Sequence, residues 1–240
     1  MTFKDILCAL LIPHICASYY FQVVKKQLKP AKIKLLNHLI YALLTLITIK
    51  VFYINIEWHY PLTIIISHLL ISSFICLAKK LIRLTQNQVF ITDLILHLLT
   101  FILISYHMFL SSKNYQYTPV LLHTASITGI PVPVIFSFAT KFLLIHKPAN
   151  QFIVNLMRDY KPAENVKSEN NIQSGRMIGT MERIIMLYFL SIDQYSSVGL
   201  VLTAKSIARY NKISESQEFA EYYLSGTLLS TICVLTISLI

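Results

Sequence analysis

Hydrophobic residues along this chain come in long, nearly unbroken blocks that are separated by short polar gaps. Short alternating segments, which a β-barrel would need, do not occur among them. A block of about 18 or more apolar residues, coiled as a helix, matches the roughly 30 Å hydrocarbon core of a bilayer. A helix also satisfies its own backbone amides, for which lipid offers no partners. The pattern therefore predicts an all-α, polytopic bundle of transmembrane helices with the lipid bilayer as its surroundings.

Five blocks precede the one extended polar stretch of the chain. We expect helices at residues 5–24, 35–54, 61–78, 89–110 and 118–145. Pro131 and Pro133 lie within the fifth of these helices, and each removes a backbone donor. A kink or break is therefore expected in the fifth helix.

The stretch from 177 to 209 is apolar but contains Asp193 near its middle. A carboxylate at the centre of a lipid-facing span is costly, so a single span is disfavoured. Two shorter helices, 177–191 and 195–209, avoid this cost as a hairpin that is re-entrant or buried, and a last helix follows at 217–240. This arrangement gives about six full spans plus the hairpin. The predicted regions are five helices at 1–145, a partly disordered cytoplasmic polar loop at 146–176, and the hairpin with the last helix at 177–240.

Composition and charge agree with this arrangement. The chain is 55% hydrophobic and only 13% charged, whereas soluble domains carry about 25% charged residues. Its net charge of +10 falls in gaps between the apolar blocks, and no nucleic-acid recognition motif accompanies it. Membrane orientation therefore explains the charge better than nucleic acid does. If the hairpin returns to its own side, the four most basic gaps are all cytoplasmic and the N-terminus is external.

Histidine carries the most specific chemical signal in the sequence. Four of the histidines, His14, His38, His68 and His97, are distributed one to each of the first four predicted helices. Asp93 precedes His97 by four residues, which places both on one helix face. Such a cluster can bind a divalent transition metal or relay protons, with His14, His68, Asp93 and His97 as candidate metal ligands. Buried histidines also serve to fix helix packing, and no HExxH motif is present to decide between these roles.

A second set of polar residues lies in the predicted hairpin: Glu182, Arg183, Asp193, Gln194 and Lys205. Glu182 and Arg183 are adjacent and cannot share a helix face, so each needs a different partner. Lys205 is expected to pair with Asp193 or with Glu182. The four cysteines lie in apolar blocks without CxxC pairs, which argues against a disulfide framework or a thiolate zinc site.

Three stretches resemble a known family. They are His14-Ile-Cys-Ala-Ser-Tyr-Tyr-Phe-Gln22 with His38 and Tyr41, the segment from His68 through Asp93 to His97, and Gly175-Arg-Met-Ile-Gly-Thr-Met-Glu-Arg183 with Gln194-Tyr195 and Ala204-Lys205-Ser206. Together they are similar to the multi-pass membrane proteins grouped as domain of unknown function 3307. The resemblance implies the bacterial inner membrane and no established activity. Two aspartates of the family pattern are Ser18 and Ser72 here, which weakens a metal site that would use them.

Three functions remain open at this point. The favoured one is a non-enzymatic membrane component whose basic cytoplasmic loops contact a soluble partner or anionic lipid, with a homo-oligomer as a further option. The second is an ion, proton or small-solute pathway along the histidines and Asp93. The third is an intramembrane metal-dependent hydrolase that uses the same residues. Imidazoles that converge on a common centre would favour a metal, and separate, locally bonded pairs would favour packing.

Overall fold

The computed structural model describes residues 2–21, 30–53, 55–111, 115–161 and 169–240. These residues form helices and connecting turns, and the one strand-like feature among them is an isolated antiparallel bridge between Tyr53 and Tyr117. The prediction of an all-α fold is therefore confirmed. The chain divides into two compact units, Met1–Thr140 and Lys141–Ile240, and the dividing point falls within a helix.

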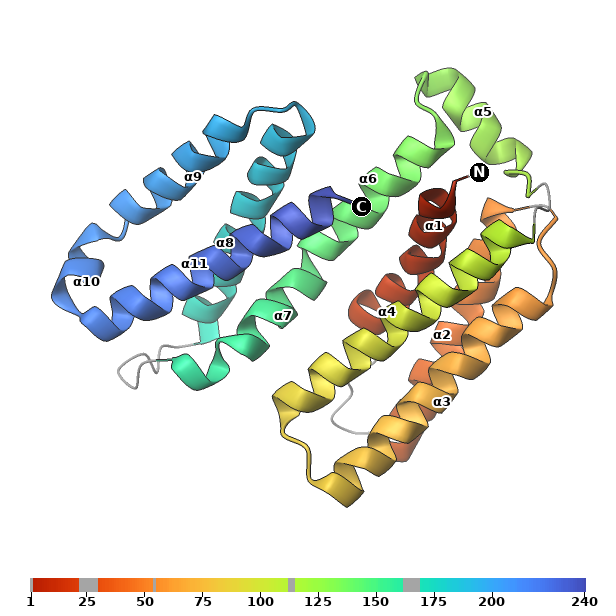
Figure 1. Ribbon diagram of the computed structural model, residues 1–240, viewed down its shortest axis with the longest axis horizontal. Helices are drawn as coiled ribbons and strands as arrows, with labels where there is room; N and C mark the ends of the chain where they lie inside the picture. Colours follow the sequence, from red (N-terminus) through yellow and green to blue (C-terminus); the bar gives the residue numbers. More distant parts are fainter. Residues whose placement is uncertain (1, 22–29, 54, 112–114, 162–168) are drawn as a thin grey trace. The chain divides into compact units, whose positions relative to one another are not determined.

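Figure 1 shows the helices in chain order. The first unit contains α1 (Phe3–Ile15), a π-helical turn (Cys16–Tyr20), α2 (Pro30–Phe52), α3 (His59–Ile82), α4 (Gln86–Leu110), α5 (Pro119–Thr128) and most of α6 (Val132–Ile145). The second unit contains α7 (Lys147–Leu156), a 3-10 turn (Arg158–Tyr160), α8 (Glu169–Ser191), α9 (Tyr195–Ile207), α10 (Tyr210–Glu215) and α11 (Gln217–Ser238).

Helices α1 to α4 form a four-helix bundle in the first unit. Both α1 and α3 pack against α2 and α4, so the four helices enclose a common centre. A capping box fixes the start of α1, where Thr2 and Asp5 bond each other's backbone amides. Almost every side of α1 is buried, as expected for a short helix that is apolar all round. His14 lies in the last turn of this buried helix.

Within the described residues, four helices are long and apolar enough to cross a membrane: α2 from Lys32, α3, α4 and α11. The pair formed by Pro119–Thr128 and Val132–Leu156 passes the same criterion together but is bent by 91°, which gives up to five spans. The first helix is not among them, because its α-helical part has 13 residues and a span needs about 20. By length and composition the described residues thus support four or five spans, and the six predicted spans are not confirmed.

The expected break in the fifth predicted helix is present. Helix α5 ends at Thr128, and Gly129 follows with a φ of 69°, which is the left-handed conformation that glycine adopts without strain. Helix α6 begins after Pro131, which has no amide to continue the hydrogen-bonding of a helix. One predicted helix is therefore two, and the reason is the Gly-Ile-Pro sequence at 129–131.

The expected helical hairpin is also present in the second unit. Helices α8 and α9 pack against each other and are joined through Asp193, whose φ of 57° is left-handed. The amide of Gln194 donates to the carbonyl of Phe189 at 2.8 Å, which closes the C-terminus of α8 in the manner of a Schellman motif. Asp193 therefore ends a helix instead of lying within one.

The polar stretch at 146–176 is partly helical, so the expectation of a loop is wrong for much of it. Helix α7 occupies Lys147–Leu156 and packs against α8 and α11, and α8 already begins at Glu169. Pro148 stands in the first turn of α7, where a missing amide costs nothing. Residues 162–168 lie outside the described part of the chain.

Candidate functional site

Three histidines from three helices meet at the centre of the first unit. We call His14 of α1, His68 of α3 and His97 of α4 the histidine cluster. Each offers a ring nitrogen, and these three atoms all lie within 4.8 Å of one another. The ring centroids of His14 and His97 are 4.7 Å apart, and those of His68 and His97 are 5.0 Å apart. The cluster is held by packing of α1 and α3 against α4, not by sequence proximity.

Hydrogen bonds orient two of the three rings. The Nδ1 atom of His97 lies 2.9 Å from the backbone carbonyl of Asp93 and 3.3 Å from its carboxylate. Both are acceptors, so Nδ1 of His97 carries the hydrogen and its Nε2 atom is free to accept. Nε2 lies 2.9 Å from Nδ1 of His68, which therefore donates to it. Asp93 thus fixes the tautomer of His97 and presents the Nε2 lone pair to the cluster.

The third histidine has an unsatisfied nitrogen. Nδ1 of His14 is buried, and no hydrogen-bond partner for it occurs among the residues that the structure describes. An unpartnered buried polar atom costs about 1–3 kcal/mol, and such atoms often mark a bound water or ion. Three imidazoles are a donor set that suits zinc and the neighbouring first-row transition metals. The residues present therefore fit a transition metal ion.

Aromatic side chains form the walls of the cluster. The ring of Tyr41 stacks on that of His68 with centroids 3.7 Å apart and meets the edge of His14 at 5.7 Å. Phe101 contacts His14 from another side at 4.9 Å. Tyr41 and Phe101 are each 2% exposed, so they exclude water from this side of the imidazoles. Electrostatic interactions are stronger in such a dry environment.

The remaining two predicted site residues lie at the border of the cluster. The ring of His38 is 5.5 Å from that of His68, but His38 does not belong to the group of three. The Asp93 side chain is 48% exposed and stands behind His97. The apolar pattern of the sequence does not mark Tyr41 and Phe101 as walls of the site. Helical spacing could have identified them as neighbours of the histidines. Tyr41 follows His38 by three residues and Phe101 follows His97 by four, so each pair lies on one helix face.

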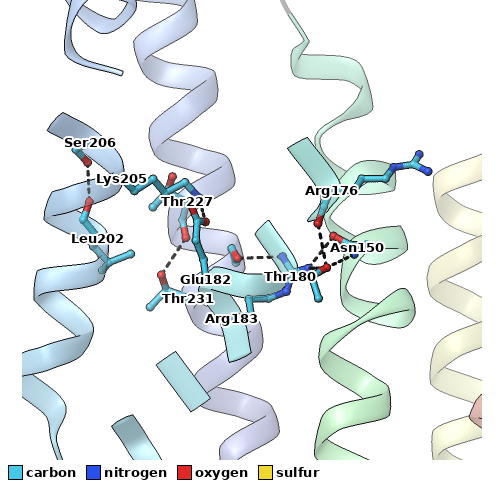
Figure 2. Close-up of polar contacts among 11 residues, drawn as sticks. Asn150, Arg176, Thr180, Glu182, Arg183, Leu202, Lys205, Ser206, Thr227 and Thr231 are labelled. Carbon is cyan, nitrogen blue, oxygen red and sulfur yellow. Dashed lines mark hydrogen bonds and ion pairs between the residues drawn. The ribbon is translucent and has the colours of Figure 1, made fainter. Parts of the chain in front are cut away.

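A second polar network lies in the second unit, between α8 and its neighbours (Figure 2). Lys205 of α9 bonds the Glu182 carboxylate of α8 at 2.6 Å, with side chains 17% and 15% exposed. Of the two partners expected for Lys205, the structure shows Glu182. Asp193 instead accepts a hydrogen bond from the hydroxyl of Tyr195 at 2.8 Å, and Gln194 is the N-cap residue that precedes α9.

Arg183 points away from Glu182 and is almost completely buried. Its donors reach the Ile145 carbonyl at 3.1 Å, Asn150 Oδ1 at 2.7 Å and Ser230 Oγ at 3.3 Å. The hydrogen-bond partners that the structure describes for this guanidinium are neutral. They come from the end of α6, from α7 and from α11, so Arg183 joins three helices to α8. We assign this network to packing of the second unit.

Comparison with known proteins gives one result. A family model described as protein of unknown function (DUF3307) matches residues 6–126, about half of the chain. The searches of curated proteins and of solved structures found no match. The matched region contains the whole histidine cluster with His38 and Asp93, whereas the stretch from Gly175 to Arg183 lies outside it. The chain therefore belongs to the DUF3307 family.

Proposed function

We propose that this chain is a multi-pass membrane protein that binds one divalent transition metal ion through His14, His68 and His97. The single observation that carries this proposal is the convergence of three ring nitrogens within 4.8 Å, contributed by three separate helices. The unpartnered Nδ1 of His14 also supports it, because an unsatisfied buried nitrogen on one of these imidazoles is typical of a site that holds a bound water or ion. His68 and His97 bond each other, as packing histidines can, whereas Nδ1 of His14 has no partner among the described residues.

The membrane part of the proposal rests on apolar surface. Helices α2, α3, α4 and α11 are suited in length and hydropathy to cross a bilayer, and many of their large apolar side chains are exposed. In the proposed topology, α1 with its π-helical turn and the bent pair α5–α6 complete six crossings. The hairpin α8–α9 returns to its own side, the basic gaps are cytoplasmic and the N-terminus is external. The bacterial inner membrane is the proposed location.

The cluster fits a metal ion with an open coordination position. Zinc takes four ligands at about 2.0–2.1 Å from nitrogen, so tetrahedral ligand nitrogens are about 3.4 Å apart. The bonded pair His68–His97 is closer than this at 2.9 Å, and no pair in the cluster exceeds 4.8 Å. Small side-chain rotations would therefore suffice. The fourth position would be left for water or another ligand.

Metal binding without hydrolysis is favoured over an intramembrane hydrolase. A hydrolase needs a group that takes a proton from the attacking water. Within the described residues, Asp93 is the carboxylate beside the cluster, and it is engaged with Nδ1 of His97. This arrangement resembles the carboxylate–histidine–metal chains that orient a ligand. We therefore propose a metal-binding membrane component, whose soluble partner or second copy would contact its basic loops.

A proton pathway is the second candidate, and a specific observation favours it. The hydrogen bonds from His68 to His97 and from His97 to Asp93 form a continuous chain between a buried site and a half-exposed carboxylate. Protons can move along such a chain. A pathway of this kind needs no metal, so metal content separates the two candidates.

The test is metal analysis of the full chain, purified in detergent and dialysed after exposure to Zn²⁺. We expect about one ion per chain in the wild type and much less in His68→Ala and His97→Ala. His123→Ala is the control, because His123 is exposed on α5 and lies outside the cluster. Wild-type protein without bound metal would refute the metal site and leave the proton pathway as the better account.

A further inference from the structure

His38 lies next to the histidine cluster without belonging to it. Its ring on α2 meets that of His68 edge-on, with centroids 5.5 Å apart. The group whose nitrogens can all serve one ion contains His14, His68 and His97 and, among the described residues, no fourth member. His38 is half-buried, whereas His97 is only 6% exposed. The cluster therefore has one histidine neighbour that reaches toward the surface of the bundle.

The surroundings of His38 do not favour a resident cation. Lys34 lies one helical turn earlier on α2, is exposed, and interacts electrostatically with His38. A permanently bound metal ion at His38 would be repelled by this ammonium group. The same repulsion favours onward movement of the ion to the three ligands of the cluster. The position thus suits a ligand that is used during transfer and not in the final complex.

Resting on the metal site proposed above, we propose that His38 is an entry ligand: a divalent transition metal ion binds its imidazole first and passes through His68 into the histidine cluster. The adjacency of the two rings provides the path. Exchange between neighbouring imidazoles avoids a state in which the ion has lost its water shell without gaining a protein ligand. The aromatic walls formed by Tyr41 and Phe101 make such a bare state costly elsewhere around the cluster.

An entry ligand has a kinetic signature that a resident ligand lacks. It stabilises the transition state of transfer but neither the free nor the final bound state. Its removal must therefore slow association and dissociation by the same factor and leave the equilibrium dissociation constant unchanged. A loss of about 1.4 kcal/mol in the transition state corresponds to a tenfold decrease in both rates.

The experiment uses full-length protein in detergent micelles with Co²⁺ as the probe. Stopped-flow absorbance gives the association rate, and a chase with excess EDTA gives the dissociation rate. The variants are His38→Ala and His38→Gln, of which the second retains bulk and polarity if the first disturbs folding. His123→Ala is the control. We expect both rates to fall about tenfold in both His38 variants, with unchanged stoichiometry and affinity.

Two results would overturn the role of His38. Unchanged rates in both variants would show that it takes no part in transfer. An affinity weakened tenfold or more with an unchanged association rate would show that it is a resident fourth ligand. If the wild type itself bound no Co²⁺, the proposed metal site would fail first, and the role of His38 would fail with it. The failure of one proposal is thus distinguishable from the failure of the other.

Discussion

Nδ1 of His68 and Nε2 of His97 lie 2.9 Å apart, which is hydrogen-bonding distance between two helices. Only one hydrogen can occupy the line between these atoms, so one ring donates and the other accepts. A metal ion instead requires an unprotonated nitrogen from each imidazole. The hydrogen bond and a shared metal ion are therefore alternative states of the same pair, and the cluster is preorganised for the second by the first.

Asp93→Asn is expected to weaken metal affinity without abolishing binding. Loss of a carboxylate behind a metal-bound histidine typically costs about 10–100-fold in affinity. In this chain the backbone carbonyl of Asp93 also accepts from His97 Nδ1, at 2.9 Å against 3.3 Å for the carboxylate. We therefore expect the lower end of that range, about tenfold, in a Co²⁺ titration.

The matched control for this variant is Asp193→Asn, which changes a carboxylate in the turn of the hairpin. It should leave metal affinity unchanged. A loss of more than a hundredfold in Asp93→Asn would indicate that Asp93 is itself a metal ligand. An affinity equal to that of the wild type would assign the orientation of His97 to the backbone carbonyl alone.

The Glu182–Lys205 pair is expected to show strong coupling in a double-mutant cycle. Both side chains are mostly buried, so removal of one partner leaves an uncompensated charge. Glu182→Gln and Lys205→Met should each lower the free energy of unfolding by about 3 kcal/mol, and the double variant should lose much less than their sum. Unfolding in mixed micelles measures this. Additive losses would contradict the pairing. Lys212→Met is the control, because Lys212 is an exposed lysine.

Arg183→Lys is expected to destabilise the protein although the charge is kept. Lysine cannot reproduce the planar fork that serves Ile145, Asn150 and Ser230 from three directions. Each buried acceptor left unpaired costs about 1–3 kcal/mol, so we expect a loss of about 3 kcal/mol. Thermal unfolding in detergent measures the change. Arg158→Lys serves as the control, because Arg158 is exposed, and an equal effect of both variants would refute the role of the network.

Gly175 and Gly179, which lie one helical turn apart on α8, should respond differently to replacement by a larger residue. A Cβ atom at Gly179 would lie 3.4 Å from a guanidinium nitrogen of Arg183, whereas one at Gly175 would meet nothing within 4 Å. Gly179→Leu should therefore displace Arg183 and cost about 2 kcal/mol. Gly175→Leu should be neutral or slightly stabilising, since leucine favours helix. Equal effects in thermal unfolding would contradict this assignment.

Much of the fold could be predicted because its signals are local. Long apolar blocks mark the helices, and the Gly-Ile-Pro sequence at 129–131 marks the break between α5 and α6. The turn at Asp193 could be predicted because a carboxylate in the middle of a lipid-facing span is energetically costly. Helix α7 was missed, because a short amphipathic helix in a polar stretch resembles a loop by composition and is stabilised by its contacts with α8 and α11.

The sequence indicated which histidines to consider but not how they would be arranged. One histidine per helix suggested convergence, and the structure places His14, His68 and His97 together and His38 at their border. Which of the four would meet depends on how the helices rotate about their axes, and tertiary packing sets that rotation. The stacking of Tyr41 on His68 is of the same kind, since it joins α2 to α3.

X-ray absorption spectroscopy at the zinc edge, on the Zn²⁺-loaded full chain in detergent, tests the central claim most directly. The account predicts a first shell with imidazole scattering from three histidines, at about 2.0–2.1 Å, and a fourth light ligand. His14→Ala should remove one imidazole or the bound ion altogether. A shell without multiple imidazoles, or one that contains sulfur at about 2.3 Å, would contradict the three-histidine site.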